Sequence, residues 1–355
     1  MDAPAAGPRR DRTAFVLIFA ALLAFTVALM AFSIPAGAYS VYSDRLSPTL
    51  TYSSPFSPYL WLGPAADFPP IETSIGVMFA FVTTIYVAFF LYSLVQTEHP
   101  LRAMSRALGE GVGALLSSPF IALVVGIGVL NFGGSAIDQV VTAVGAPIGG
   151  PSLQSDPLGL LASFSYSPLV EELGFRVLLI GVVAFILCLS RPWKVALGAL
   201  WRPSKAIEGM AIGSGASVII WAATGLSAVT FGACHVVCGS TWDIGKLPEA
   251  TFGGLVLGYL YVRYGFHVAV LAHWGVDYFG SVLSFFGQAA YGISWSSATT
   301  EYSGQYLVDL DMLYLFGLVS FLLALYLGIR KVAAWRSAGH PEELDKAAMG
   351  GEVGP

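Results

Sequence analysis

The sequence has little charge. Only 11% of its 355 residues are Asp, Glu, Lys or Arg, whereas a soluble globular domain carries about 25%. Hydrophobic residues make up 56% of the chain. A chain of this composition has too few charged side chains to cover a water-exposed surface, which indicates that its main solvent is a lipid bilayer.

The sequence also lacks a basic excess. Its formal net charge at pH 7 is −5. A nucleic-acid partner requires a basic face that neutralises phosphates, and no such face is visible in the sequence. We therefore expect no nucleic-acid partner.

Cysteine is scarce as well. The three cysteines, Cys188, Cys234 and Cys238, lie in apolar stretches, where a free thiol usually behaves as a small buried hydrophobe. We therefore predict no disulfide framework. Cys234 and Cys238 flank His235, but no second pair of such ligands follows, so a zinc–thiolate site is disfavoured.

Long apolar segments are what the chain has in quantity. A helix needs about 20 apolar residues to cross the hydrocarbon core. The first segment is longer than the core of a signal peptide, which has about 7–15 residues, so we predict that it is retained. We therefore expect an all-α, polytopic transmembrane helix bundle of about eight spans. The windows are 14–38, 74–96, 112–133, 161–190, 210–238, 250–263, 266–288 and 312–330.

The basic residues fall on alternate loops of this assignment. The positive-inside rule places such residues in the cytoplasm, so both termini are predicted to be cytoplasmic. Only Arg45 and Lys246 lie in loops on the opposite side. We expect a multi-pass protein of a prokaryotic plasma membrane. The residues on the predicted cytoplasmic side are Arg9, Arg10, Arg12, Arg102, Arg106, Arg191, Lys194, Arg202, Lys205, Arg263, Arg330, Lys331, Arg336 and Lys346.

The segments outside these windows do not resemble separate domains. Residues 39–73 are rich in Ser, Pro and Tyr, and residues 134–160 are rich in Gly and Pro, so both are predicted to be external loops. We expect a cytoplasmic N-terminus over 1–13, a single transmembrane domain over 14–337 and a disordered cytoplasmic tail over 338–355.

Six ionisable residues lie inside the predicted spans. A charge at bilayer depth costs at least about 2.5–3.5 kcal/mol on insertion scales, so such residues indicate a functional site by default. Unpaired charges in hydrocarbon would be prohibitive, and we expect the six to converge. They are Glu171, Glu172, Arg176, His235, His273 and Asp277, while His267 lies only at the edge of a span.

Helical spacing predicts which of these groups pair. Glu172 and Arg176 are four residues apart and share a helix face, while Glu171 lies about 100° round the helix. His273 and Asp277 are also four apart, so the carboxylate can orient the imidazole. One buried ion pair or one histidine can serve packing alone, but six such residues on three segments favour a functional site.

Three motifs carry these residues in order. They are Glu171-Glu172-Leu-Gly-Phe-Arg176, Phe231-Gly-Ala-Cys-His235 and His273-Trp-Gly-Val-Asp277. They resemble the EExxxR, FxxxH and HxxxN/D motifs of the CAAX protease and bacteriocin-processing (CPBP) family, which includes the Ras-converting CAAX endopeptidases. The resemblance covers about 165–285.

This resemblance implies an intramembrane endopeptidase that acts in the lipid bilayer on a membrane protein or a lipidated, CAAX-like peptide. By the family pattern, Glu171 would be the general base and His235 its partner in activating a water. Glu172 and Arg176 would position that pair. His273 and the residue four positions later would stabilise the oxyanion of the tetrahedral intermediate.

Asp277 departs from the CAAX-processing branch, which typically has Asn at this position. An ionised carboxylate cannot donate to an oxyanion, so Asp277 must be protonated, orient His273 or help to bind a metal. Activation of water by a glutamate requires no cofactor. A divalent metal such as zinc is the alternative, because imidazoles and carboxylates suit it; the ligands would be Glu171, His235, His273 and Asp277.

The link from Arg176 to Phe231 is longer than the family usually shows, and 191–208 resembles a basic cytoplasmic insertion. Simple counting places His235 near the outer end of its span and His273 nearer the inner end of its own. At least one helix at the site is therefore predicted to be broken or tilted.

Two other classes of function stay open. The first is a non-catalytic regulatory or immunity membrane protein of the same fold. The second is a proton or ion transporter, because intramembrane acids and histidines also form relays. The sequence shows neither an inverted repeat nor paired Gly/Pro-broken spans, which disfavours transport.

Overall fold

The computed structural model describes residues 7–43, 53–56, 71–96, 98–150, 157–207, 215–238, 241–292 and 303–338. Apart from one short antiparallel hairpin, the regular structure in these ranges is helical, as predicted. The elements are α1 (Gly7–Tyr42), β1 (Ser53–Phe56), β2 (Ile71–Ser74), α2 (Ile75–Val95), α3 (Pro100–Glu110), η1 (Val112–Ser117), α4 (Pro119–Ala143), α5 (Pro157–Glu172), η2 (Leu173–Gly181), α6 (Val182–Leu187), α7 (Trp193–Trp201), α8 (Pro203–Ile207), α9 (Gly215–Val237), α10 (Lys246–Tyr264), α11 (Phe266–Tyr291) and α13 (Ser303–Ala338).

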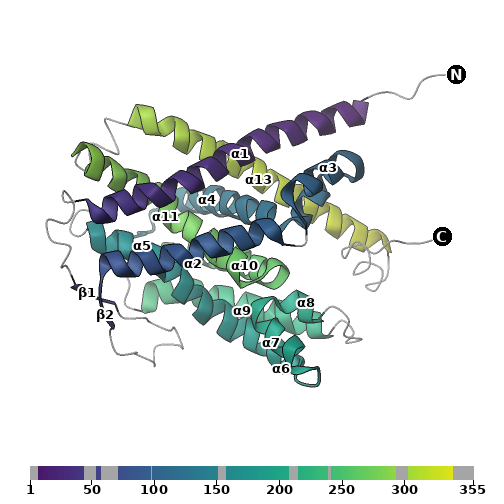
Figure 1. The fold of residues 1–355 in the computed structure, drawn as a ribbon. Helices are drawn as coiled ribbons and strands as arrows, with labels where there is room; N and C mark the ends of the chain where they lie inside the picture. Colours follow the sequence, from purple (N-terminus) through teal and green to yellow (C-terminus); the bar gives the residue numbers. More distant parts are fainter. Residues whose placement is uncertain are drawn as a thin grey trace.

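The two ends of the bundle differ. The start of α1 and the end of α13 lie at one end, together with the short helices α3, α7 and α8 (Figure 1). The hairpin of β1 and β2 lies at the opposite end. Long helices connect the two ends, which is the arrangement expected of a chain that crosses a bilayer several times.

Each of the eight predicted windows overlaps a helix or a run of consecutive helices, although residues 210–214 of the fifth window lie outside the described residues. By length and composition, five helices of the described residues can cross a membrane, and α11 is a sixth if its two halves, bent by 45° at Gly280, form one span. A polytopic membrane protein is therefore supported. The count of eight crossings and the cytoplasmic position of both termini stay predictions.

The predicted window 112–133 begins too early. Residues Val112–Ser117 form a 3₁₀-helix, and α4 starts at Pro119. Proline suits the first position of a helix, because its missing N–H would have no partner there and its ring fixes φ. In the same way, α1 begins at Gly7, within the predicted N-terminal segment, while residues 339–355 of the predicted tail lie outside the described residues.

The predicted loop 134–160 is shorter in the structure, because α4 continues to Ala143 and α5 starts at Pro157. The glycines near its start serve packing rather than a turn. A methyl group at Gly133 would lie 2.5 Å from the Phe252 ring of α10. Glycine content therefore marked a close helix contact at the start of the segment, and a loop only in its later part, where Gly145, Gly149 and Gly150 have positive φ.

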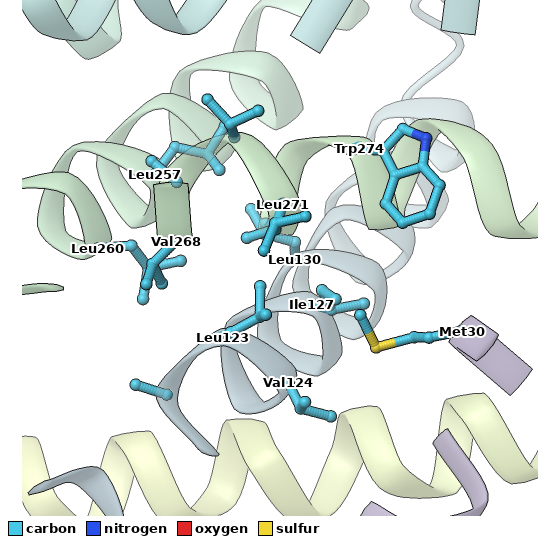
Figure 2. Close-up of a cluster of buried hydrophobic side chains, with 14 of the residues drawn as sticks. Met30, Leu123, Val124, Ile127, Leu130, Leu257, Leu260, Val268, Leu271 and Trp274 are labelled. Carbon is cyan, nitrogen blue, oxygen red and sulfur yellow. The ribbon is translucent and has the colours of Figure 1, made fainter. Parts of the chain in front are cut away.

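The core lies between α4, α10 and α11. Figure 2 shows Leu123 and Ile127 of α4 beside Leu257 of α10 and Leu271 of α11. Every residue of α11 from Phe266 to Gly275 is buried, so this helix is the centre of the bundle. Lipid tails are as apolar as these side chains, and close packing rather than transfer from water therefore holds the helices together.

The helices α9 and α10 approach each other through small residues. A methyl group at Gly254 would lie 2.7 Å from Ala228 Cα, and one at Gly232 would lie 2.9 Å from the Leu247 carbonyl oxygen. Small residues permit such close backbone contact between membrane helices. The contact restricts the rotation of α9 about its axis. It thereby also restricts the direction in which His235, the histidine of the second motif, points.

We expect Gly232→Ala to destabilise the protein by about 1–3 kcal/mol, because the added methyl group overpacks the contact with the α10 backbone. Gly225→Ala, in the same helix, is the matched control, since no atom lies within 4 Å of its added Cβ. Thermal unfolding of both variants in detergent measures the effect. Equal unfolding temperatures would contradict the close approach of α9 to α10.

Candidate active site

The first motif lies where α5 becomes a π-helix. Glu171 and Glu172 end the α-helical part, and Leu173–Gly181 forms the π-helix η2. Pro168 lies inside α5 one turn earlier and has no N–H to donate to the helix. π-Helical turns are rare and frequent at functional sites. The first motif therefore lies on an irregular helix, while the bent helix is α11, which carries the third motif.

Glu172 and Arg176 form the buried pair that their spacing predicts. Arg176 Nε lies 2.9 Å from Glu172 Oε2 with neither side chain exposed, although the angle is poor for a hydrogen bond. Arg176 Nη1 donates to Ser227 Oγ at 3.1 Å, and Ser227 Oγ donates to the Phe175 carbonyl oxygen at 2.7 Å. The guanidinium also lies 4.7 Å from the Phe231 ring centroid. Arg176 thereby joins the first motif to α9.

His273 joins the third motif to the first. Its Nδ1–H donates to Glu172 Oε1 at 3.0 Å. Its Nε2 faces Asp277 Oδ2 at 3.5 Å and Glu171 Oε2 at 3.8 Å. One nearly buried imidazole therefore contacts three carboxyl groups from two segments, including the partner that its spacing of four to Asp277 predicts.

His235 lies beside this cluster, and the Phe231 ring contacts both histidines. Its Nδ1–H donates to the Phe231 carbonyl oxygen at 2.9 Å, which leaves Nε2 of the neutral ring as an acceptor. The Phe231 ring centroid lies 4.6 Å from that of His235 and 5.6 Å from that of His273. The structure thus brings five of the six predicted residues into direct contact and places His235 next to them.

Ser227 is a site residue that the motifs did not single out. It lies four residues before Phe231 and eight before His235, so all three share one face of α9. Extending the helical spacing of the second motif by one turn would have found it.

The prediction of no disulfide was wrong. Cys234 and Cys238 form a disulfide at the end of α9, with 4.9 Å between their Cα atoms. A spacing of four places both side chains on one helix face, close enough for a bond without any wider framework. Cys188 is free and buried, as predicted.

Among the described residues, no group of three or more His, Cys, Asp or Glu side chains is arranged to hold a metal ion. In the predicted donor set, His235 Nδ1 is hydrogen-bonded to a carbonyl oxygen, and both nitrogens of His273 face carboxyl groups. The zinc alternative, at Glu171, His235, His273 and Asp277, stays a prediction.

A buried cluster of carboxyl groups and histidines between apolar helices is typical of membrane-embedded enzymes and proton relays. Residues 153–279 match the family described as Type II CAAX prenyl endopeptidase Rce1-like, and this range includes all three motifs. The match confirms the resemblance to CAAX proteases and supports protease activity in a multi-pass membrane protein. The comparisons with curated proteins and with solved structures gave no match.

Removing the Ser227 hydroxyl should take away the acceptor of the Arg176 Nη1 hydrogen bond, inside a site where Arg176 is fully buried. We expect Ser227→Ala to lower the stability by about 1–3 kcal/mol, the usual cost of an unsatisfied buried polar group. Thr230→Ala is the control, because exposed Thr230 donates to the Leu226 carbonyl of its own helix. If both variants unfold at the same temperature in detergent, Ser227 does not support Arg176.

Proposed function

We propose that the chain is an intramembrane endopeptidase that hydrolyses a peptide bond of a membrane-embedded or lipid-anchored substrate. The observation that carries this proposal is the position of His273, which is held by Glu172 on one nitrogen and lies beside Glu171 and Asp277 with the other. A packing residue would need one partner, whereas this imidazole contacts three carboxyl groups.

Glu171 is the general base in this proposal. Its carboxylate takes a proton from a water that is also held by His235 Nε2, and the water oxygen forms a bond to the peptide carbonyl carbon. The carbonyl oxygen becomes the oxyanion. The proton on Glu171 then passes to the amide nitrogen, the C–N bond breaks, and the products are a carboxylic acid and an amine.

Glu172 and Arg176 are positioning residues. Glu172 accepts from His273 Nδ1, which fixes the orientation of the ring and directs Nε2 toward Glu171 and Asp277. Arg176 neutralises Glu172 and holds it between η2 and α9. Neither group is exposed, so both act through His273 and not on the substrate.

The oxyanion is stabilised by His273 and Asp277. Three carboxyl groups surround one guanidinium and one imidazole, so a cluster without net charge has at least one neutral carboxyl group, whether or not His273 is protonated. Net charge at this depth is costly, which favours that state. A neutral Asp277 carries an O–H that can donate to the oxyanion, as the Asn of related proteases would.

Glu171→Gln keeps the shape of the side chain and removes its proton affinity. We expect turnover to fall by about 10²–10⁴, the usual share of general-base catalysis, with an unchanged unfolding temperature. The measurement is product analysis of detergent-purified protein with a peptide library. Glu110→Gln in α3, an exposed glutamate paired with Arg106, is the control. Undiminished cleavage by Glu171→Gln would favour the non-catalytic alternative.

Asp277→Asn separates the two catalytic types. An amide donates a hydrogen bond, so activity should survive if Asp277 serves the oxyanion. A metal site would lose a charged ligand and much of its affinity. Cleavage by wild type and Asp277→Asn is measured with and without chelator. Activity that is lost in both the variant and the chelator-treated wild type would establish metal dependence.

A further inference from the structure

The partly exposed groups of the site lie toward one end of the bundle. His235 and Asp277 follow the buried motif residues of α9 and α11, and both helices run toward the hairpin end (Figure 1). Glu171 precedes the buried residues of its segment, and α5 starts at that same hairpin end. The side chains of Glu171 and Asp277 are 20% and 29% exposed, whereas those of Glu172 and Arg176 are fully buried. The exposed surface of the site therefore lies on its hairpin side, which we call the open end.

The opposite end of the site is closed by the inserted segment. Its helices α7 and α8 pack against the end of α10, where Tyr261 OH donates to the Leu200 carbonyl oxygen at 2.7 Å. Arg202 Nε donates to the Arg263 carbonyl oxygen at 2.8 Å. Tyr261 is fully buried. The predicted insertion 191–208 thus supplies a cap, formed by α7 and α8, that covers the buried side of the site.

The two ends also differ in chemistry. The closed end carries the start of α1, the end of α13 and exposed basic residues such as Arg102, Arg191 and Lys194. The positive-inside rule assigns an end with such basic residues to the cytoplasm. The Cys234–Cys238 disulfide lies at the other end of α9. Disulfides form and persist in oxidising, extracytoplasmic compartments. Charge and redox chemistry independently assign the open end to the extracytoplasmic side.

We infer that the site takes its substrate from the extracytoplasmic side, as an exported or membrane-anchored polypeptide whose scissile bond reaches the outer half of the bilayer. This inference rests on the proposed protease function. A cytoplasmic protein with a lipidated C-terminus would insert from the opposite leaflet, where the cap of α7 and α8 separates it from His273. Such a protein would approach the site from the end of the bundle where α7 and α8 pack against α10.

Cysteine labelling tests from which side of the membrane the site is accessible, and it does not require the protein to be active. Asp277→Cys should react with a membrane-impermeant maleimide in right-side-out vesicles and lose that labelling in inverted ones. Val195→Cys, at an exposed position of α7, should show the reverse. Val144→Cys, exposed at the end of α4, should follow Asp277→Cys and reports the sidedness if that variant does not fold.

The native cysteines provide the background for this experiment. Wild-type protein should stay unlabelled in both preparations, because Cys188 is buried and the other two are paired. Reduction should expose Cys234 and Cys238 to the reagent in right-side-out vesicles. Labelling of Asp277→Cys or Val144→Cys from inverted vesicles alone would overturn the inference, and so would free native thiols in unreduced cells.

An activity measurement separates this inference from the proposed function. An impermeant, quenched-fluorescent peptide library should be cleaved by right-side-out vesicles, and cleavage should be lost in inverted ones. Detergent-solubilised protein gives the total activity. Cleavage by inverted vesicles alone would overturn the sidedness and leave the protease intact. No cleavage in detergent would overturn the protease, while the labelling pattern still decides which side the site faces.

Discussion

The structure of the site depends on one constraint: a guanidinium without exposed surface must find its partners inside the protein. Arg176 has an ion-pair partner in Glu172 of its own segment, a hydrogen-bond acceptor in Ser227 and a ring contact with Phe231, the last two in α9. These partners fix how η2 and α9 face each other. The contact of α9 with α10 through small residues supports the same orientation of α9, because the close backbone approach allows this helix little rotation about its axis.

The two oxygens of Glu172 divide the site into a supporting part and a reacting part. One oxygen faces Arg176 and the other accepts from His273, so the buried ion pair also orients an imidazole on the central helix α11. The groups beyond that imidazole, Glu171 and Asp277, are the ones with exposed surface. The buried pair of Glu172 and Arg176 therefore fixes the positions of the site residues, and the partly exposed Glu171 and Asp277 are the groups that a substrate can contact.

The ends of the helices complete this arrangement. On one side, the cap of α7 and α8 is bound to α10 by two hydrogen bonds: Arg202 Nε donates to the Arg263 carbonyl oxygen of α10, and Tyr261 OH of α10 donates to the Leu200 carbonyl oxygen of α7. On the other side, the Cys234–Cys238 disulfide closes the last turn of α9, directly beside His235. One end of the site is thus packed and the other is accessible, with a covalent restraint where a helix end would otherwise fray.

The sequence by itself determined the helical membrane class and the pairs within one helix, Glu172 with Arg176 and His273 with Asp277. Composition and a spacing of four carry that information, because helix geometry is local. Only the tertiary structure decided that His273 meets Glu172, 101 residues away, and that Ser227 supports Arg176. Such contacts depend on how far each helix is rotated, and that rotation is set by close packing between segments that are distant in the chain.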